Sequence, residues 1–301
     1  MADKTDLHIS EGLRYPYVPI VDRPQFLWPN NAGVALWVIP NVEYYPFDLP
    51  GATVNDRAVA SKPDVLNHSW RDYGVRVGIW RLFECLDQVG IKVSATLNSE
   101  VCDEYPAIIE AGNKRNWEWL GHGTTNSIRL TGMEPKDEAA LIKSVLDRIQ
   151  AGTGSRPRGW LGPGLAESYN TLDILTDSGI EYVCDWIADD LPFWMKASSG
   201  RILSVPYSIE MNDMELVLRQ KLTGPQYRQR LIDQFRQLRL ESLREKRGRV
   251  MAIPLHPFLT GQAHRIGYLK SALDFIVNQP DTWVATGSEI MDYFVSMENS
   301  S

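Results

Sequence analysis

The chain alternates between short, wholly apolar runs and longer segments in which apolar residues recur every three or four positions. Residues 33–40 (GVALWVIP) are apolar throughout, which is typical of a strand buried on both faces of a sheet. Residues 134–150 instead place their apolar side chains along one face of a helix. This alternation predicts a parallel sheet covered by helices.

Applied to the whole chain, the two periodicities predict a regular succession of elements. The expected strands are residues 33–40, 92–98, 117–122, 158–161, 181–186, 201–206, 249–256 and 282–285. The expected helices are residues 76–90, 101–115, 134–150, 170–178, 226–247 and 267–277. No glycine-rich phosphate or dinucleotide loop follows the first strand, which argues against an open, doubly wound sheet. We therefore expect an α/β fold: a single deformed (β/α) barrel, TIM-like and of about seven strands.

Two segments interrupt this rhythm. Residues 1–30 contain prolines and aromatic residues without periodicity, and we expect them to form an extended arm on the surface of one domain, residues 31–301. Residues 44–74 are expected to form a long loop after the first strand. Loops of this length without secondary structure of their own are usually functional.

Composition and charge narrow the class of protein. The formal net charge of −7 argues against nucleic acid or an acidic membrane as a partner, because both attract basic surfaces. No apolar run reaches the length of a transmembrane helix, and the polar N-terminus lacks the apolar segment of a signal peptide. Cys85, Cys102 and Cys184 are odd in number and widely spaced, as in reduced proteins. We expect a cytoplasmic protein that acts on a small molecule.

Polar residues gather at the predicted strand ends, where barrel enzymes carry their chemistry. Two of the five histidines, His122 and His256, follow the third and seventh predicted strands. Asn41 and Glu43 end the first strand two positions apart, so their side chains point the same way, and Asp185 ends the fifth. The sequence therefore predicts an active site built from Glu43, His122, Asp185 and His256.

A metal site is a second interpretation of the same residues. His122 lies between Gly121 and Gly123, which permit close approach of another molecule, and Asn126 follows it by four positions. Two imidazoles and two carboxylates suit general acid–base hydrolysis with or without a metal. The available zinc ligands would be Glu43, His122 and Asn126, and amide side chains bind zinc weakly. We therefore favour no tightly bound metal, with zinc as the alternative.

Taken together, these motifs resemble the polysaccharide deacetylase (NodB-homology) superfamily, and within it the cofactor-independent branch of allantoinases and cyclic-imide hydrolases. The resemblance extends between residues 25 and 295, and the motifs are specific as a set. They are Asn41-Val42-Glu43, residues 73–81, Gly121-His122-Gly123, Gly159-Trp160, residues 189–194, Val205-Pro206-Tyr207, Asn212-Asp213-Met214 and His256.

The resemblance implies a deformed (β/α) barrel of fewer than eight regular strands that hydrolyses a carbon–nitrogen bond in an amide-like substrate. Metal-dependent members end the first strand with an aspartate pair, and here those positions hold Asn41 and Glu43. Their two histidines four residues apart correspond to His122 and Asn126, and their general acid matches His256. The chain thus departs from the metal-binding pattern. Cytosolic members of the branch tend to be oligomers, so we expect a homo-oligomer.

We expect a hydrolase of a small cyclic amide, imide or ureide. Glu43 would activate water or hold it, His256 would donate a proton to the departing nitrogen, and His122 would polarise the carbonyl group or orient the water. Asp185 would position a histidine or an arginine, with Arg76 as the first candidate, and Glu43 and Asp185 could exchange roles. The residues expected to contact substrate are Asn41, Arg76, Asn126, Trp160 and Trp186.

Two other functions remain open. The first is metal-dependent deacetylation of an N-acetylated sugar or small amide, although a secreted enzyme of that kind would normally carry a signal peptide. The second is an inactive barrel that binds a small molecule, which the joint presence of both histidines and Glu43 disfavours. Trp160 and Trp186 suit core packing as well as substrate contact, and Arg76 with Asp72 suits a structural ion pair.

Overall fold

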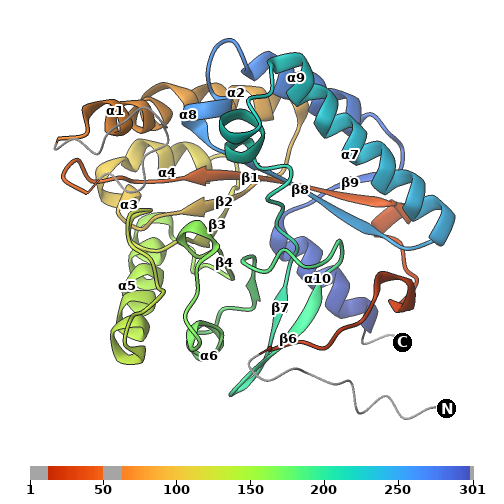
Figure 1. Cartoon of the computed structure of the whole chain (residues 1–301), viewed down its shortest axis with the longest axis horizontal. Coiled ribbons are helices and arrows are strands. Elements are labelled where there is room, and N and C mark those ends of the chain that lie inside the picture. Colours follow the sequence, from red (N-terminus) through yellow and green to blue (C-terminus); the bar gives the residue numbers. More distant parts are fainter. Residues whose placement is uncertain (1–12, 50–62, 299–301) are drawn as a thin grey trace.

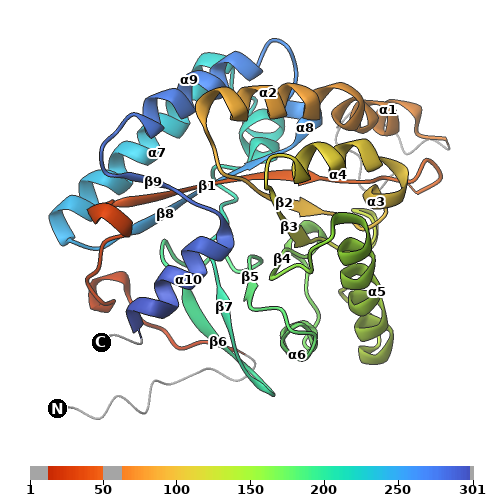
Figure 2. The same cartoon turned by 180° about the vertical axis from the view of Figure 1, so that it is seen from behind.

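The chain forms one curled, open sheet with helices packed over its outer face, in a computed structural model that describes residues 13–49 and 63–298 (Figures 1 and 2). The strand order within these residues is β6-β7-β5-β4-β3-β2-β1-β8, and β9 also pairs with β1. Every pairing is parallel except that of β6 with β7. The predicted deformed barrel of parallel strands is confirmed.

The strands are β1 (Val34–Val42), β2 (Ser94–Leu97), β3 (Glu118–Gly121), β4 (Gly159–Trp160), β5 (Tyr182–Val183), β6 (Phe193–Ala197), β7 (Gly200–Ser204), β8 (Arg249–Leu255) and β9 (Thr282–Val284). The α-helices are α1 (Val65–Tyr73), α2 (Ile79–Val89), α3 (Val101–Glu104), α4 (Pro106–Asn113), α5 (Pro135–Thr153), α6 (Thr171–Asp177), α7 (Gly224–Glu245), α8 (Pro257–Thr260), α9 (Ile266–Val277) and α10 (Gly287–Glu298). Two π-helical turns, η3 (Gly74–Gly78) and η5 (Met214–Arg219), adjoin the mouth of the barrel.

Strand β1 is buried along its whole length because both of its edges are paired. One edge pairs with β8, and the other pairs first with β9 and then with β2. Its side chains that face the helices are Val34, Leu36 and Val38, and those that face the barrel interior are Ala35, Trp37 and Ile39. Because successive strand residues point to opposite faces, Asn41 and Glu43 continue the inward series at the carboxyl end.

Strands β3 and β8 bring the two histidines to the same place by the same alternation. Leu120 on β3 faces the barrel interior, and His122 lies two residues further on. Val250 and Ala252 on β8 face the interior, and His256 extends that series by four residues. The carboxyl ends of these two parallel strands, which lie on either side of β2 and β1 in the sheet, therefore direct polar side chains into one mouth of the barrel.

The sequence missed several elements. Helix α1 lies inside the predicted loop 44–74, and the Asp64 side chain caps it by accepting a hydrogen bond from the Asn67 amide at 3.1 Å. Residues 50–62 of that loop lie outside the described residues. Strand β6 was also missed, because it forms a short hairpin with β7 beyond the parallel pattern. Helix α10 follows the last predicted strand, and its apolar face packs into the interior core.

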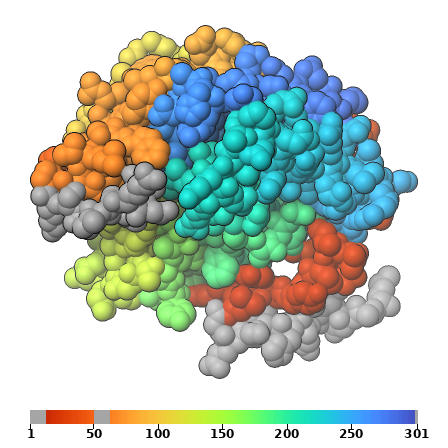
Figure 3. Space-filling model, turned by 45° about the horizontal axis from the view of Figure 1, so that its top comes forward, coloured from red at the N-terminus to blue at the C-terminus, as the bar shows by residue number. Residues whose placement is uncertain are grey.

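The described part of the predicted N-terminal arm, residues 13–30, is anchored to the barrel. Arg14 forms an ion pair with Asp173 at 2.8 Å, and Arg23 forms one with Asp189. Trp28 is fully buried. Figure 3 shows this red segment lying beneath the green part of the chain. Residues 1–12 of the arm lie outside the described residues.

Two expectations from composition can be compared with the structure. Cys85, Cys102 and Cys184 are all unpaired thiols, as expected. Within the described ranges, no helix combines the length and apolar character that crossing a membrane requires.

Gly78 links the fold to the mouth of the barrel, because η3 packs against α8, the helix that follows His256. A Cβ atom at Gly78 would overlap the carbonyl oxygen of Pro257. We expect Gly78→Ala to displace α8 and to lower the free energy of unfolding by about 1–3 kcal/mol, measured by urea unfolding. Gly267→Ala in α9 is the control, since its Cβ would meet no atom within 4 Å. Equal losses in the two variants would contradict the prediction.

Candidate functional site

Glu43 lies at the mouth of the barrel between the two histidines that the sequence singled out. Its Oε1 atom lies 3.7 Å from Nε2 of His122 and 3.6 Å from Nε2 of His256. Asn126 donates from Nδ2 to the same oxygen at 2.6 Å, and the Tyr45 hydroxyl donates to Oε2 at 2.8 Å. The Glu43 side chain is only 7% exposed. The structure thus brings together one carboxyl group and two imidazoles from three separate strands.

His256 is held as a cation by a buried carboxylate. Its Nδ1 atom lies 2.7 Å from Oδ1 of Asp213, and Oδ2 of Asp213 accepts hydrogen bonds from the His256 amide and the Thr260 hydroxyl. Burial alone would lower the pKa of His256, but the charges of Asp213 and Glu43 raise it from 6.5 to about 10. At neutral pH His256 is therefore an imidazolium whose Nε2–H group faces Glu43.

His122 directs a hydrogen-bond acceptor toward Glu43, whereas His256 directs a donor. Its Nδ1 atom lies 2.6 Å from the carbonyl oxygen of Leu161, and because a carbonyl oxygen only accepts, we assign the hydrogen to Nδ1. In the neutral ring, Nε2 then carries a lone pair directed to the same side as Glu43. One imidazole can thus donate a proton into the site while the other can accept a hydrogen bond there.

Glu43 is a carboxylate in spite of its burial. Burial alone would raise the pKa of Glu43, but the charge of His256 and the contacts with both imidazoles outweigh it and hold that pKa well below its ordinary value. Burial and the Glu43 charge raise the pKa of Tyr45, so its hydroxyl keeps its proton and donates to Glu43. The site therefore contains a base and an acid in contact.

The residues at the mouth do not fit a tightly held metal. Of the three expected ligands, Asn126 directs its amide nitrogen at Glu43 at 2.6 Å, and its Oδ1 accepts from Arg129 at 3.4 Å. A donor nitrogen facing a carboxylate is not a ligand arrangement. In the part of the chain that the structure describes, no group of three or more His, Cys, Asp or Glu side chains is arranged to hold a metal ion.

Two small cavities adjoin Glu43. Each has a volume of about 10 Å³, and Glu43, Tyr45, Arg71 and Val75 line both. A volume of this size holds roughly one water molecule. The guanidinium carbon of Arg71 lies 3.7 Å from the centre of the Tyr45 ring and helps to close the space. Space for a single water therefore lies directly beside the carboxylate.

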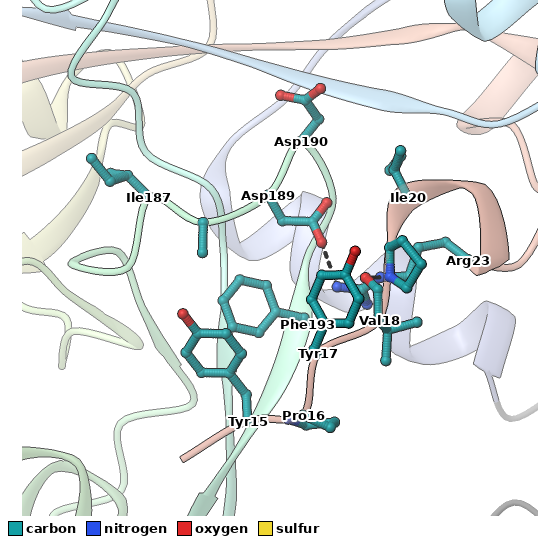
Figure 4. A pocket seen from close by; sticks show the side chains of 12 residues that line it. Tyr15, Pro16, Tyr17, Val18, Ile20, Arg23, Ile187, Asp189, Asp190 and Phe193 are labelled. Carbon is teal, nitrogen blue, oxygen red and sulfur yellow. Dashed lines mark hydrogen bonds and ion pairs between the residues drawn. The ribbon is translucent and has the colours of Figure 1, made fainter. Parts of the chain in front are cut away.

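A larger cavity lies elsewhere, between the N-terminal arm and the segment after β5 (Figure 4). Its volume is about 410 Å³, and the ion pair between Arg23 and Asp189 crosses one wall. Among its described lining residues are none of the site residues expected from the sequence. The chemistry-bearing residues are thus separate from the larger surface hollow.

Arg76 does not reach the site. Its side chain is 73% exposed and lies 3.6 Å from Asp72, one helical turn earlier. The expectation that Arg76 contacts substrate is therefore wrong, and the ion pair describes it correctly. Arg71 takes the position beside Glu43 instead. The sequence missed it because α1, which carries Arg71, was assigned to a loop.

Neither predicted tryptophan lines the cavities beside Glu43. Trp160 is fully buried in the core between sheet and helices, where its ring packs against Gly121. It lies one position before the inward-facing Leu161, so strand alternation turns it away from the mouth. Trp186 packs edge-on against Tyr15 and donates from Nε1 to Glu167 at 3.0 Å. Both residues have packing roles. The prediction of substrate contact is wrong for Trp160, and for Trp186 it stays a prediction.

Asp185 and Asn41 are near the site but use their polar atoms on the protein itself. Asp185 accepts a hydrogen bond from the Gly162 amide at 2.8 Å and contacts Glu167, so it is not the direct partner of a histidine or of Arg76. The two polar groups of Asn41 bind the Thr96 hydroxyl at 2.9 Å and the Leu255 carbonyl at 3.2 Å. Asn41 thereby joins β1 to its two neighbours under Glu43.

Sequence reasoning also left out residues that complete the site. Asp213 follows β7 and was noted only within a motif, because the turn η5 that directs it at His256 has no clear periodicity. Tyr45 could have been found, since it continues the alternating inward series of Asn41 and Glu43. Its hydroxyl donates to Glu43.

Comparisons with known proteins agree with this architecture. Residues 63–183 match the family model described as polysaccharide deacetylase. A Schizosaccharomyces pombe protein, whose name assigns it provisionally to the polysaccharide deacetylases, is 25% identical over 87% of this chain and 90% of its own length. The crystal structure of a probable polysaccharide deacetylase from Pseudomonas aeruginosa PAO1 has a TM-score of 0.81 at 25% identity, covering 91% of this chain and 95% of that one. Puue allantoinase has a TM-score of 0.82 at 23% identity, covering 91% and 94%.

The protonation of His256 can be measured directly. We expect its imidazole to titrate near pH 10 and Asp213→Asn to lower this pKa, because the substitution removes the nearest negative charge. The measurement is a pH series of imidazole nitrogen NMR spectra. Asp87→Asn, which disturbs the surface ion pair with Arg115, is the control and should leave the titration unchanged.

The same shift has a consequence for stability. A pKa raised in the folded state contributes stability that is fully present below the unfolded value of about 6.5 and is lost as the pH rises through the folded value. The wild type should therefore lose stability between pH 6.5 and about 10, and Asp213→Asn should lose less over that window. A wild-type His256 that titrates near pH 6.5 would contradict both expectations.

Proposed function

Because the chain belongs to the polysaccharide deacetylase family, a family of hydrolases, we propose that it hydrolyses the carbon–nitrogen bond of a small cyclic amide, imide or ureide. One observation carries this proposal: a buried carboxylate, Glu43, lies 3.6 Å from the imidazolium of His256. Hydrolysis of an amide needs a base for the water and an acid for the leaving nitrogen. Here both groups lie side by side at the mouth of the barrel.

In the proposed reaction, Glu43 acts on a water molecule held beside it. The carboxylate removes one proton from the water as the oxygen bonds to the substrate carbonyl carbon. His122 accepts a hydrogen bond from the water through Nε2, because its Nδ1–H group is already used on Leu161. This arrangement supports water orientation rather than carbonyl polarisation as the role of His122, since a ring nitrogen that carries a lone pair cannot donate to a carbonyl.

His256 completes the reaction from the other side. As the carbon–nitrogen bond breaks, Nε2 of His256 donates its proton to the departing nitrogen. Asp213 keeps the imidazole oriented throughout. Glu43 then holds one proton and His256 lacks one, and transfer between them across 3.6 Å, through water, restores the starting state. The net reaction consumes one water and yields a carboxylic acid and the released N–H group of an amine, an amide or a urea, which stay joined when the substrate is cyclic.

The choice of a small cyclic substrate is supported by the likeness of fold to Puue allantoinase. The cavities beside Glu43, about 10 Å³ each, have room for the attacking water. Metal-dependent deacetylation is less well supported, because Asn126 directs a donor nitrogen at the carboxylate.

A substrate panel tests the proposal. We expect purified protein to turn over at least one compound among hydantoins, succinimides and allantoin, with no loss of activity after chelation. Glu43→Gln and His256→Ala should each lower kcat by roughly 10²–10⁴-fold, the usual contribution of a general base or acid. His264→Ala is the matched control, because His264 is exposed, and it should retain full activity.

Other outcomes would assign a different function. Turnover of N-acetylated sugars that depends on stoichiometric zinc would replace the proposal with metal-dependent deacetylation. Binding of panel compounds without turnover, unaffected by Glu43→Gln, would indicate a binding protein.

A further inference from the structure

Two carboxyl groups after strands β4 and β5, half-buried Glu167 and buried Asp185, have no part in the steps above. Oδ1 of Asp185 accepts a hydrogen bond from the Gly162 amide at 2.8 Å. Its Oδ2 atom is buried, and no ordinary donor in the described ranges reaches it. The carboxyl group of Glu167 is in hydrogen-bond contact with that of Asp185. Two carboxyl groups can bond to each other only when one of them carries a proton.

The surroundings place that proton on Asp185. Burial, followed by the charge of Glu167, raises the pKa of Asp185 well above its ordinary value. Burial raises the pKa of Glu167 to about 7, although its hydrogen bonds with Asp185 and Trp186 lower this pKa. The charge of Glu138 raises the pKa further, and the charge of Arg14 lowers it. Because Trp186 donates to Glu167, Glu167 is the accepting member. Asp185 is thus a neutral acid near neutral pH.

One peptide unit connects this pair to the site. The N–H group of Gly162 donates to Asp185, and the carbonyl oxygen of the preceding residue, Leu161, lies 2.6 Å from Nδ1 of His122. A trans peptide unit is planar, with its N–H and C=O groups pointing in opposite directions. A contact that fixes the direction of the N–H group therefore also fixes the direction of the carbonyl oxygen, which accepts the hydrogen bond from Nδ1 of His122.

The close approach of Asp185 to this peptide depends on a glycine. A Cβ atom at Gly162 would lie 3.2 Å from Oδ2 of Asp185 and 2.8 Å from the carbonyl oxygen of Ala166. A side chain at this position would push the carboxyl group away from the amide. The local backbone is thus arranged so that Asp185 reaches the peptide unit.

We infer that Asp185 is a positioning residue, which orients His122 through the Leu161–Gly162 peptide unit by accepting a hydrogen bond from the Gly162 amide. The effect on turnover rests on the proposed function, in which His122 orients water. The orientation of the His122 ring can be measured without any substrate.

Two substitutions at Asp185 separate this role from that of a charged group. Asp185→Asn keeps both hydrogen bonds, because the amide oxygen can accept from Gly162 and the amide nitrogen can donate to Glu167. Asp185→Ala removes both. We expect the NMR signal of the His122 Nδ1-bound proton to persist in D185N and to shift or disappear in D185A. With a substrate, kcat of D185A should fall roughly 10–100-fold, as for other residues that orient a functional histidine, with KM unchanged and D185N close to wild type.

Controls keep the two proposals apart. Glu118→Ala removes a carboxylate at the opposite end of β3, where it binds Tyr182 and Ser288, and should leave the His122 signal unchanged. If D185A does not fold, Glu167→Ala replaces it and should weaken the same signal.

Three results would overturn the inference: equal losses in D185N and D185A, an unchanged His122 signal in D185A, or an unchanged signal in Glu167→Ala when that variant serves as the replacement. A wild type that turns over no compound would count against the proposed function, and the NMR comparison would still decide the role of Asp185.

Discussion

A carboxylate held almost out of water between two imidazoles is the interaction on which the barrel mouth depends. Burying a charge costs several kcal/mol unless its partners compensate, and for Glu43 they do so from several directions. His256 supplies the opposite charge, and Asn126 and Tyr45 supply hydrogen bonds to both oxygens. Asp213 in turn stabilises the cation. Charges of alternating sign therefore run inward from the mouth, and loss of one leaves the next uncompensated.

The sheet supplies the geometry that this chain of charges needs. The inward series on β1, β3 and β8 end in Glu43, His122 and His256, so three strands far apart in the sequence deliver one functional group each. Asn41 also links the strands beneath these residues, because its amide nitrogen donates to a carbonyl on β8 and its oxygen accepts from a hydroxyl on β2. The parallel pairing of the strands thus fixes the spacing between base and acid before any side chain adjusts.

This dependence on strand alternation explains what could be predicted from the sequence. The fold and the three central residues were predictable, because apolar runs mark buried strands and the polar residues that end them share a mouth. Trp160 was predicted to face the mouth, but its side chain faces the helices. An error of one residue in the expected end of the strand is enough to reverse the face. Arg71 and Asp213 were missed because they lie on a helix and a π-helical turn outside the pattern. The position of Asp185 at a strand end was predicted from the sequence, but its partner Glu167 was not, because Glu167 lies in a loop without periodicity.

The charge state of the site also bears on how Glu43 could accept a proton while His256 stays in place beside it. In metal-assisted hydrolysis, a bound ion supplies the positive charge beside the nucleophile. In the proposed reaction the imidazolium of His256 would supply it. Once Glu43 has gained a proton and His256 has given one up, both are neutral, so their combined charge is zero before and after the two transfers. Between the transfers the cation of His256 would be balanced by the negative charge on the substrate oxygen, and Asp213, bound by the His256 amide and the Thr260 hydroxyl, would keep the ring in place until the proton returns.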